Sequence, residues 1–152
     1  MMSSSRETRR LFGTLLAQTA RHWRRAVDRE LEPHGLTEAT WLPLIRVARA
    51  SEPMRQKDVA ESLSLDGSSV VRLLDNLQSA GLIERREGTD RRTKAIHLTA
   101  LGRVTVGRVD RIARQVREQA LAEVSDEDIE KVSGILGRIC SALLPANEDA
   151  EL

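Results

Sequence analysis

The sequence predicts a mostly α-helical protein with one small β-hairpin, and two patterns lead to this fold class. Apolar residues recur every three or four positions through several long segments, which is the spacing of one face of an α-helix. Between Leu82 and Leu98, two short segments with strand-like alternation flank a polar turn, which is typical of paired strands. The length of 152 residues suits one domain, or one domain with flanking arms.

The first predicted helix runs from about Arg6 to Leu31 and ends before the helix-breaking segment 33–35. Thr37 is a candidate N-cap for a second helix, which the Ser-Glu-Pro segment at 51–53 closes. The apolar stripe of the first helix consists of Phe12, Leu16, Ala20, Trp23, Val27 and Leu31.

Two shorter helices follow, over 56–63 and about 67–80, with a turn between them. Asp66 can cap the second of these helices, and Gly81 suits the position just after its C-terminal end. A helix, a short turn and a second helix form the arrangement that lays its second helix in a major groove of DNA.

The predicted hairpin comes directly after this pair of helices. Residues 82–86 form its first strand, 87–92 the turn and 93–98 the returning strand. A hairpin in this place is a wing, so residues 36–98 are predicted to form a winged helix-turn-helix domain that binds DNA.

Two further helices are predicted in the C-terminal part. Thr99 can cap the first, in which we expect Gly102 and Gly107 to be weak points, and Ser125 begins the second. We expect residues 6–32 and 99–145 to be dimerisation helices, because their apolar stripes have no obvious partner within the chain. The alternative is that all six helices pack within one chain. Residues 146–152 are expected to form a frayed acidic tail.

Composition excludes several classes of protein. A net charge of +1 means that any nucleic-acid surface must be a local patch. Two tryptophans, one phenylalanine and no tyrosine argue against a module that stacks single-stranded bases. The single cysteine, Cys140, excludes an internal disulfide, and we expect it to be a small buried hydrophobe.

The sequence also predicts neither catalysis nor a cofactor. The Gly67-Ser68-Ser69 segment lacks a nucleophile elbow, no phosphate-loop lysine occurs, and the three histidines lack metal-ligand spacing. No apolar run approaches the ~20 residues of a membrane span, and the first ten residues lack the apolar core of a signal peptide. We therefore expect a soluble, cytoplasmic protein that is not an enzyme.

Several motifs, taken in order, resemble the SlyA branch of the MarR family of transcription regulators. The most informative is Asp90-Arg91-Arg92 followed by Leu98-Thr99 and Gly102, which is similar to the family's wing pattern of Asp-x-Arg and then Leu-Thr-x-x-Gly. The others are Arg21-His22-Trp23-Arg24-Arg25, Leu31-Glu32-Pro33, Leu36-Thr37 with Trp41, the segment 69–77 and Gly81-Leu82-Ile83.

This resemblance implies a triangular homodimer in which the first, fifth and sixth helices interleave. Two winged units would then read a pseudo-palindromic site on double-stranded DNA. Such regulators often answer to small aromatic or phenolic ligands, or to oxidants.

On the recognition helix, we expect Ser68, Ser69, Arg72 and Asn76 to face DNA, with Arg72 placed to read guanine. The alternative for Arg72 is an ion pair with Asp75 or Asp66.

On the wing, Arg92 is expected to enter the minor groove, with Asp90 bracing it. Arg91 and Lys94 are expected to contact phosphates. Only one of Arg85 and Arg86 can face DNA, and the pattern does not decide which; Arg86 is included among the candidates.

A ligand site is predicted around Trp23, Trp41 and Thr37, with Arg21 or Arg24 close enough to meet a carboxylate. The alternative is that both tryptophans are ordinary core residues. A rival function for the whole chain is a winged-helix module that binds proteins. Such a module would expose apolar residues on its recognition face, whereas this face offers arginines and a lysine.

Overall fold

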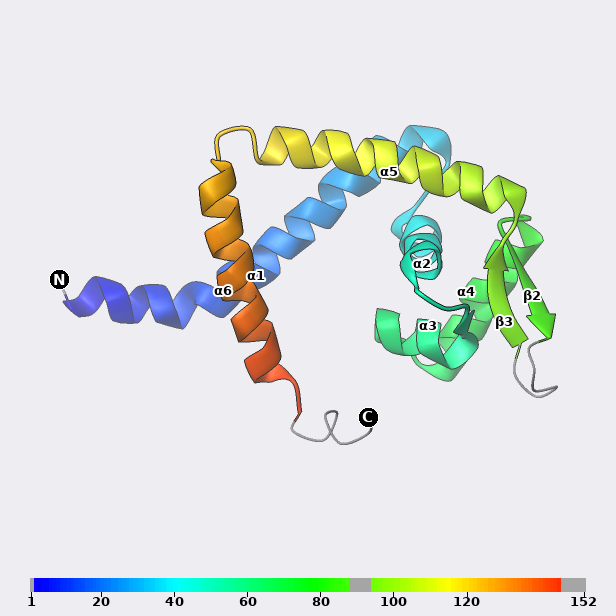
Figure 1. The fold of residues 1–152 in the computed structure, drawn as a ribbon, viewed down its shortest axis with the longest axis horizontal. Coiled ribbons are helices and arrows are strands. Elements are labelled where there is room, and N and C mark those ends of the chain that lie inside the picture. Colours follow the sequence, from blue (N-terminus) through cyan, green and yellow to red (C-terminus); the bar gives the residue numbers. More distant parts are fainter. Residues whose placement is uncertain (1, 88–93, 146–152) are drawn as a thin grey trace. The chain divides into compact units, whose positions relative to one another are not determined.

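The computed structural model describes residues 2–87 and 94–145 (Figure 1). Its helices are α1 (Met2–Leu31), α2 (Glu38–Arg49), α3 (Gln56–Leu63), α4 (Gly67–Ser79), α5 (Ala100–Ala120) and α6 (Asp126–Leu143), with a short 3-10 helix, η1 (Glu32–His34), after α1. Its strands are β1 (Met54–Arg55), β2 (Ile83–Glu87) and β3 (Lys94–Leu98). The predicted fold class, mostly helical with a small β wing, is confirmed. The chain divides into two compact units, Met1–Val116 and Arg117–Leu152.

The sheet is antiparallel, with β3 between β1 and β2. Pairing of Ile83 with Leu98 and of Glu87 with Lys94 defines the predicted hairpin. The third strand, β1, was not predicted; Met54 in it pairs with Ile96. Two residues are too few to show the alternation by which strands are predicted. This strand ties the segment between α2 and α3 to the wing.

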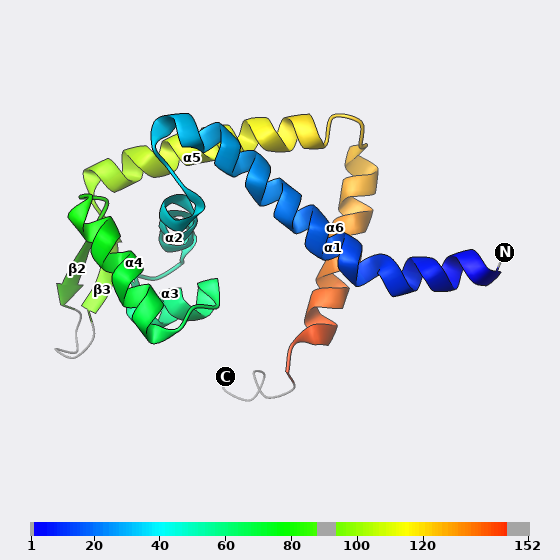
Figure 2. The ribbon, with the colours of Figure 1, turned by 180° about the vertical axis from the view of Figure 1, so that it is seen from behind.

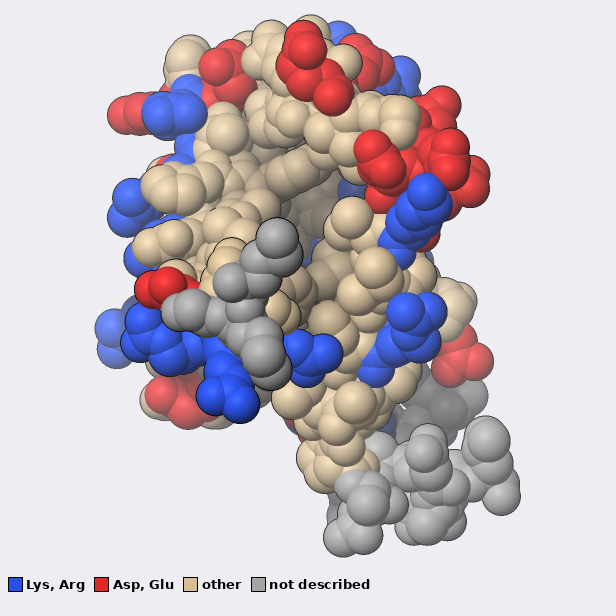
Figure 3. Space-filling view, turned by 90° about the vertical axis from the view of Figure 1, so that its left-hand side faces the viewer, with Lys and Arg blue, Asp and Glu red and all other residues tan. Residues whose placement is uncertain are grey.

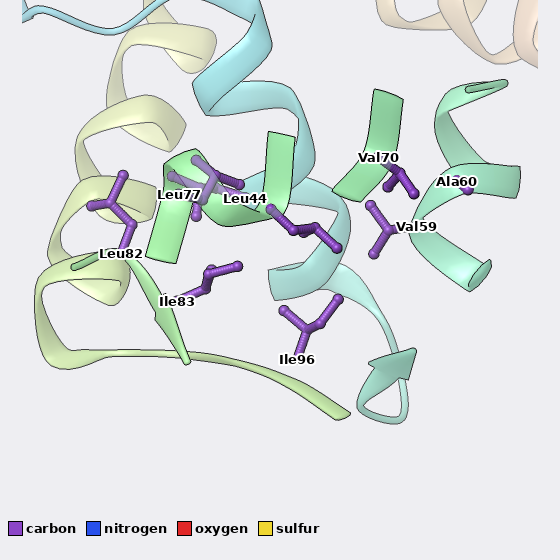
Figure 4. Close-up of a cluster of buried hydrophobic side chains, with 9 residues drawn as sticks. Leu44, Val59, Ala60, Val70, Leu77, Leu82, Ile83 and Ile96 are labelled. Atoms are coloured by element: carbon purple, nitrogen blue, oxygen red, sulfur yellow. The ribbon is translucent and has the colours of Figure 1, made fainter. Parts of the chain in front are cut away.

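The helix-turn-helix and the sheet share one hydrophobic core (Figure 4). Helices α3 and α4 are also seen from behind in Figure 2. The apolar side of α4 supplies the buried Val70, Leu74 and Leu77, whose spacing of four and three residues places them on one helical face. They pack with Leu44 of α2, Val59 and Ala60 of α3, and Leu82, Ile83 and Ile96 of the wing. Burial of this face leaves the opposite face of α4 to solvent.

A second core joins the C-terminal part of α1 to α2 and α5. Its buried members are Val27, Leu31, Leu36, Trp41, Ile45, Val109, Ile112 and Val116. The indole nitrogen of Trp41 donates a hydrogen bond of 3.2 Å to Asp28, so the buried ring keeps its polar atom satisfied. Val106 of α5 packs against both cores.

The wing meets α5 at a close junction. The Thr99 hydroxyl accepts a hydrogen bond from the Gly102 backbone, which confirms Thr99 as the cap, and it donates one to the Gly81 carbonyl. A Cβ placed on Gly102 would lie 2.1 Å from the carbonyl oxygen of Leu82. The expectation that Gly102 is a weak point was therefore wrong: its missing side chain lets α5 approach the wing. An added Cβ on Gly107 meets no described atom within 4 Å.

Two helices carry apolar side chains that the described chain leaves uncovered. On α1 these are Leu11, Phe12, Leu15 and Leu16. Helix α6 buries none of its residues within the described chain. Cys140 is exposed in the single chain, which contradicts the prediction of a buried cysteine; α6 half-buries Leu136 and Ile139 there but leaves Cys140 uncovered. Uncharged side chains occupy a broad area of the face drawn in Figure 3.

Among the described residues, no helix is long and apolar enough to cross a membrane.

Candidate nucleic-acid interface

The N-terminal end of α4 is fixed by Asp66. Its Oδ1 accepts hydrogen bonds from the Ser69 backbone N–H at 2.7 Å and from the Ser68 hydroxyl at 2.9 Å. These hydrogen bonds, the one from the Ser69 backbone first, lower the pKa of the Asp66 carboxyl below its ordinary value. The predicted cap is confirmed. The Ser68 hydroxyl hydrogen is engaged in the cap, and its oxygen remains able to accept.

The exposed face of α4 presents three polar side chains in one row. Ser69, Arg72 and Asn76 are separated by three and four residues, so they lie on the same side of the helix. All three are exposed, and they line a shallow hollow of about 290 Å³ together with Ala39 and Thr40 at the start of α2. The structure therefore brings together three of the four predicted recognition residues.

Arg72 is available for an outside partner. It forms no ion pair with any residue in the described ranges 2–87 and 94–145. Neither of the two nearby carboxylates pairs with it: Asp66, across the turn, caps the helix, and Asp75, within the helix, accepts from Arg85. The alternative of an ion pair for Arg72 is therefore wrong.

The two neighbouring arginines of β2 lie on opposite faces of the strand. Arg85 pairs across the sheet with buried Ile96, and its side chain is only 21% exposed. Arg86 pairs across the sheet with Ala95, its side chain is 62% exposed, and it forms an ion pair with Glu84. The exposed arginine, the one included among the DNA-binding candidates, is thus Arg86.

The wing tip is only partly described. Lys94 is exposed at the start of β3, opposite Glu87. Asp90, Arg91 and Arg92, the predicted tip residues, lie outside the described residues.

A cavity of about 410 Å³ lies between α1, α2 and α5. Two of the residues predicted for a ligand site, Trp23 and Trp41, line this cavity. Trp41 is also a core residue. Arg21 and Thr37 do not line it. Thr37 occupies the N-cap position of α2, and its side chain makes no capping hydrogen bond there.

Sequence reasoning missed the polar residues of this cavity, which are Arg46, Arg49 and Asp110. Arg49 Nη2 lies 3.2 Å from Asp110 Oδ1, joining α2 to α5. A signal was present, since Ile45 and Arg49 follow Trp41 at four-residue steps and therefore share its side of the helix. The described residues contain no group of histidine, cysteine, aspartate and glutamate that suits a metal ion.

Comparison with known proteins gives a family match and close structural matches. Residues 34–93 match the model of the MarR family. The transcriptional regulator PA3341 is 39% identical, with a TM-score of 0.81 over 87% of this chain and 97% of the other.

Two further structures carry bound partners. Staphylococcus aureus MepR, solved as a complex with DNA, is 26% identical, with a TM-score of 0.74 over 87% of this chain and 98% of the other. CouR from Rhodococcus jostii RHA1, solved with p-coumaroyl-CoA, is 25% identical, with a TM-score of 0.73 over 88% of this chain and 94% of the other.

Proposed function

Because this chain belongs to the MarR family of transcription regulators, we propose that it regulates transcription by binding double-stranded DNA as a homodimer and that it catalyses no reaction. The observation that carries the proposal is the exposed row of Ser69, Arg72 and Asn76 on α4, where Arg72 has no ion-pair partner among the described residues. The second helix of a helix-turn-helix, when it presents a polar and cationic face of this kind, suits the major groove of DNA.

In this mode of binding, Arg72 donates two hydrogen bonds to a guanine edge, and Asn76 extends the contact by one helical turn. Ser68 and Ser69, at the N-terminal end of α4, contact phosphate or base edges. On the wing, Arg92 enters the minor groove with Asp90 holding it, whereas Arg86, Arg91 and Lys94 neutralise phosphates.

The homodimer is supported by the uncovered apolar side chains of α1 and α6. Leu15 is 60% exposed, and Val132 and Ile135 of α6 are 49% and 44% exposed. Apolar faces of this kind on long helices are normally buried against a second subunit. A dimer with two-fold symmetry would read two half-sites, hence a pseudo-palindromic site.

The rival function, a winged-helix module that binds another protein, fits the recognition face less well. Protein interfaces concentrate aromatic and other apolar residues at their centre. The exposed row on α4 is instead polar and cationic, with Val71 as an exposed apolar neighbour.

A gel-shift titration with the DNA upstream of the protein's own gene, repeated across salt concentrations, tests this proposal. We expect a single shifted species whose affinity falls steeply with salt. Arg72→Ala should lower specific affinity by about 1–3 kcal/mol, and Arg92→Ala should abolish most specific binding without unfolding the protein.

Arg10→Ala is the matched control, because it also removes an exposed arginine but lies near the start of α1. Its affinity should equal that of the wild type. Wild-type affinity in both Arg72→Ala and Arg92→Ala would contradict the proposed interface, and binding that does not depend on salt would contradict the proposed function.

We also propose that a small aromatic or phenolic acid regulates DNA binding from the cavity between α1, α2 and α5. Its walls are mostly apolar, with Trp23 and Trp41 among them, and Arg46 and Arg49 are the cations available for a carboxylate. An acid that pairs with Arg49 would replace the contact between α2 and α5 that Asp110 now makes.

Tryptophan fluorescence titrated with salicylate-like acids tests this ligand site. Ligand should quench the emission, and Arg49→Gln should weaken binding by about tenfold, since a charged hydrogen bond is lost. Arg21→Gln is the control, because Arg21 does not line the cavity. Absence of quenching at millimolar ligand would count against the site.

A further inference from the structure

Arg85 is an arginine on the inner side of the wing. In β2 it lies on the same face as buried Ile83, and across the sheet it pairs with buried Ile96. Its side chain is 21% exposed, whereas that of its neighbour Arg86 is 62% exposed. A charged group in this position is costly unless the protein supplies partners for it.

The partner of Arg85 lies on the recognition helix. Nη1 of Arg85 donates a hydrogen bond of 2.8 Å to Oδ1 of Asp75. Asp75 follows Arg72 by three residues and precedes Asn76, so this contact joins the wing strand to the middle of α4, between the two proposed base-reading residues.

The remaining donors of this guanidinium are unsatisfied. Nε and Nη2 of Arg85 are buried and have no hydrogen-bond partner among the described residues. A buried donor without a partner is destabilising, so an arginine here adds less to stability than its single ion pair would suggest. Stability alone therefore does not account for an arginine here.

We propose that Arg85 is a positioning residue for DNA recognition: through Asp75 it holds β2 against α4, so that the wing and the recognition face meet DNA at one fixed spacing. It makes no contact with DNA itself. This proposal rests on the proposed function, because fixed spacing matters only if both elements bind the same duplex.

The test compares four proteins: the wild type, Arg85→Met, Arg85→Lys and, as a matched comparison from the same strand, Arg86→Met. Affinity for an operator duplex and for a scrambled duplex is measured across salt, and thermal unfolding confirms that each variant is folded. Methionine keeps the apolar stem of arginine, and lysine keeps one cationic donor for Asp75.

For Arg85→Met we expect the ratio of specific to non-specific affinity to fall by about tenfold, with the slope of log affinity against log salt unchanged. Arg85→Lys should restore that ratio to within about threefold, because a single donor suffices for Asp75. Arg86→Met should weaken binding to both duplexes alike and reduce the slope by about one phosphate contact.

Three results would overturn the proposal. A reduced salt slope in Arg85→Met would mean that Arg85 touches phosphate. An unchanged affinity ratio would mean that the pair serves folding alone. A Lys variant as poor as the Met variant would mean that the contact with Asp75 is not what matters.

If Arg85→Met does not fold, Asp75→Asn replaces it, since Asp75 is largely exposed; its affinity ratio should fall in the same way, and an unchanged ratio would again overturn the proposal. Failure of the proposed function is separate, because the wild type itself would then show no salt-dependent binding to duplex DNA.

Discussion

At the scale of single residues, Asp66 fixes the start of the recognition helix through the hydrogen bonds that its side chain accepts. It caps α4 through the Ser69 backbone, and these hydrogen bonds lower the pKa of its carboxyl. A carboxyl whose pKa is lowered on folding adds stability above its unfolded pKa and loses that contribution as pH falls through the folded pKa. The end of α4 is therefore expected to loosen in acid.

Asp66→Asn isolates this effect, because asparagine is an equally good cap but does not titrate. At pH 7 the variant and the wild type should have similar urea midpoints. Between pH 7 and about pH 3 the wild type should lose more stability than the variant, because only its cap is protonated. Equal losses in the two proteins would contradict the role given to Asp66.

Most of the candidate site could be predicted from local rules, and the exceptions needed tertiary contacts. Asp66, Ser69, Arg72 and Asn76 follow from a cap and a helical period, which a sequence displays directly. The choice between Arg85 and Arg86 could not be made, because it depends on β2 packing against α4. Arg49 was missed for a related reason, since its partner Asp110 is remote in sequence.

Among the elements, the junction between the wing and α5 is the most constrained. Gly81 has a φ of 74°, which favours glycine, and its carbonyl accepts from Thr99. Gly102 then lies against the Leu82 carbonyl. Thr99 and Gly102 of this motif are thus explained by a cap and a close approach rather than by DNA contact.

Gly102→Ala should destabilise the protein by about 1–3 kcal/mol, because the new Cβ overlaps a backbone oxygen that cannot rotate away. Gly107→Ala in the same helix is the control; it should be neutral or stabilising by about 0.5–1 kcal/mol. Denaturant unfolding measures both. Equal stability changes for the two variants would refute the close approach.

Element boundaries were predictable where turn chemistry marks them. The predicted bounds of 56–63 match α3, and the predicted start of α4 at residue 67 is confirmed. Strand β1 was missed because its pairing with β3 depends on residues about forty positions apart, at Met54 and Ile96. The role of Gly102 was misjudged because helix propensity describes a residue within its own helix, whereas this glycine is required by the neighbouring carbonyl of Leu82.

On the scale of the whole molecule, the main prediction concerns the assembly of two copies of the chain into a dimer. One part of α1 lies in a core with α2 and α5, whereas its N-terminal half exposes Leu11, Phe12, Leu15 and Leu16. The same helix therefore supplies a folded core and an uncovered apolar surface, which suits a subunit that is completed by a second copy.

Leu15→Asp should weaken the proposed dimer by about tenfold or more, because an unpaired polar group in an apolar interface costs at least about 1–3 kcal/mol. Sedimentation across protein concentrations measures the shift toward monomer. Leu65→Asp, a change at an exposed leucine in the turn before α4, should leave the dimer intact. A fully dimeric Leu15→Asp protein would argue against an interface at α1.

The hydrogen bonds of Thr99 also determine where the protein can be cut. A fragment that ends at Leu98 would leave the carbonyls of Gly81 and Leu82 without the donors that now satisfy them. It would also lose Val106, which covers part of the core around α4. An independently expressed DNA-reading fragment therefore has to extend at least one turn past Gly102 into α5, and domain exchange between relatives should place its crossover there.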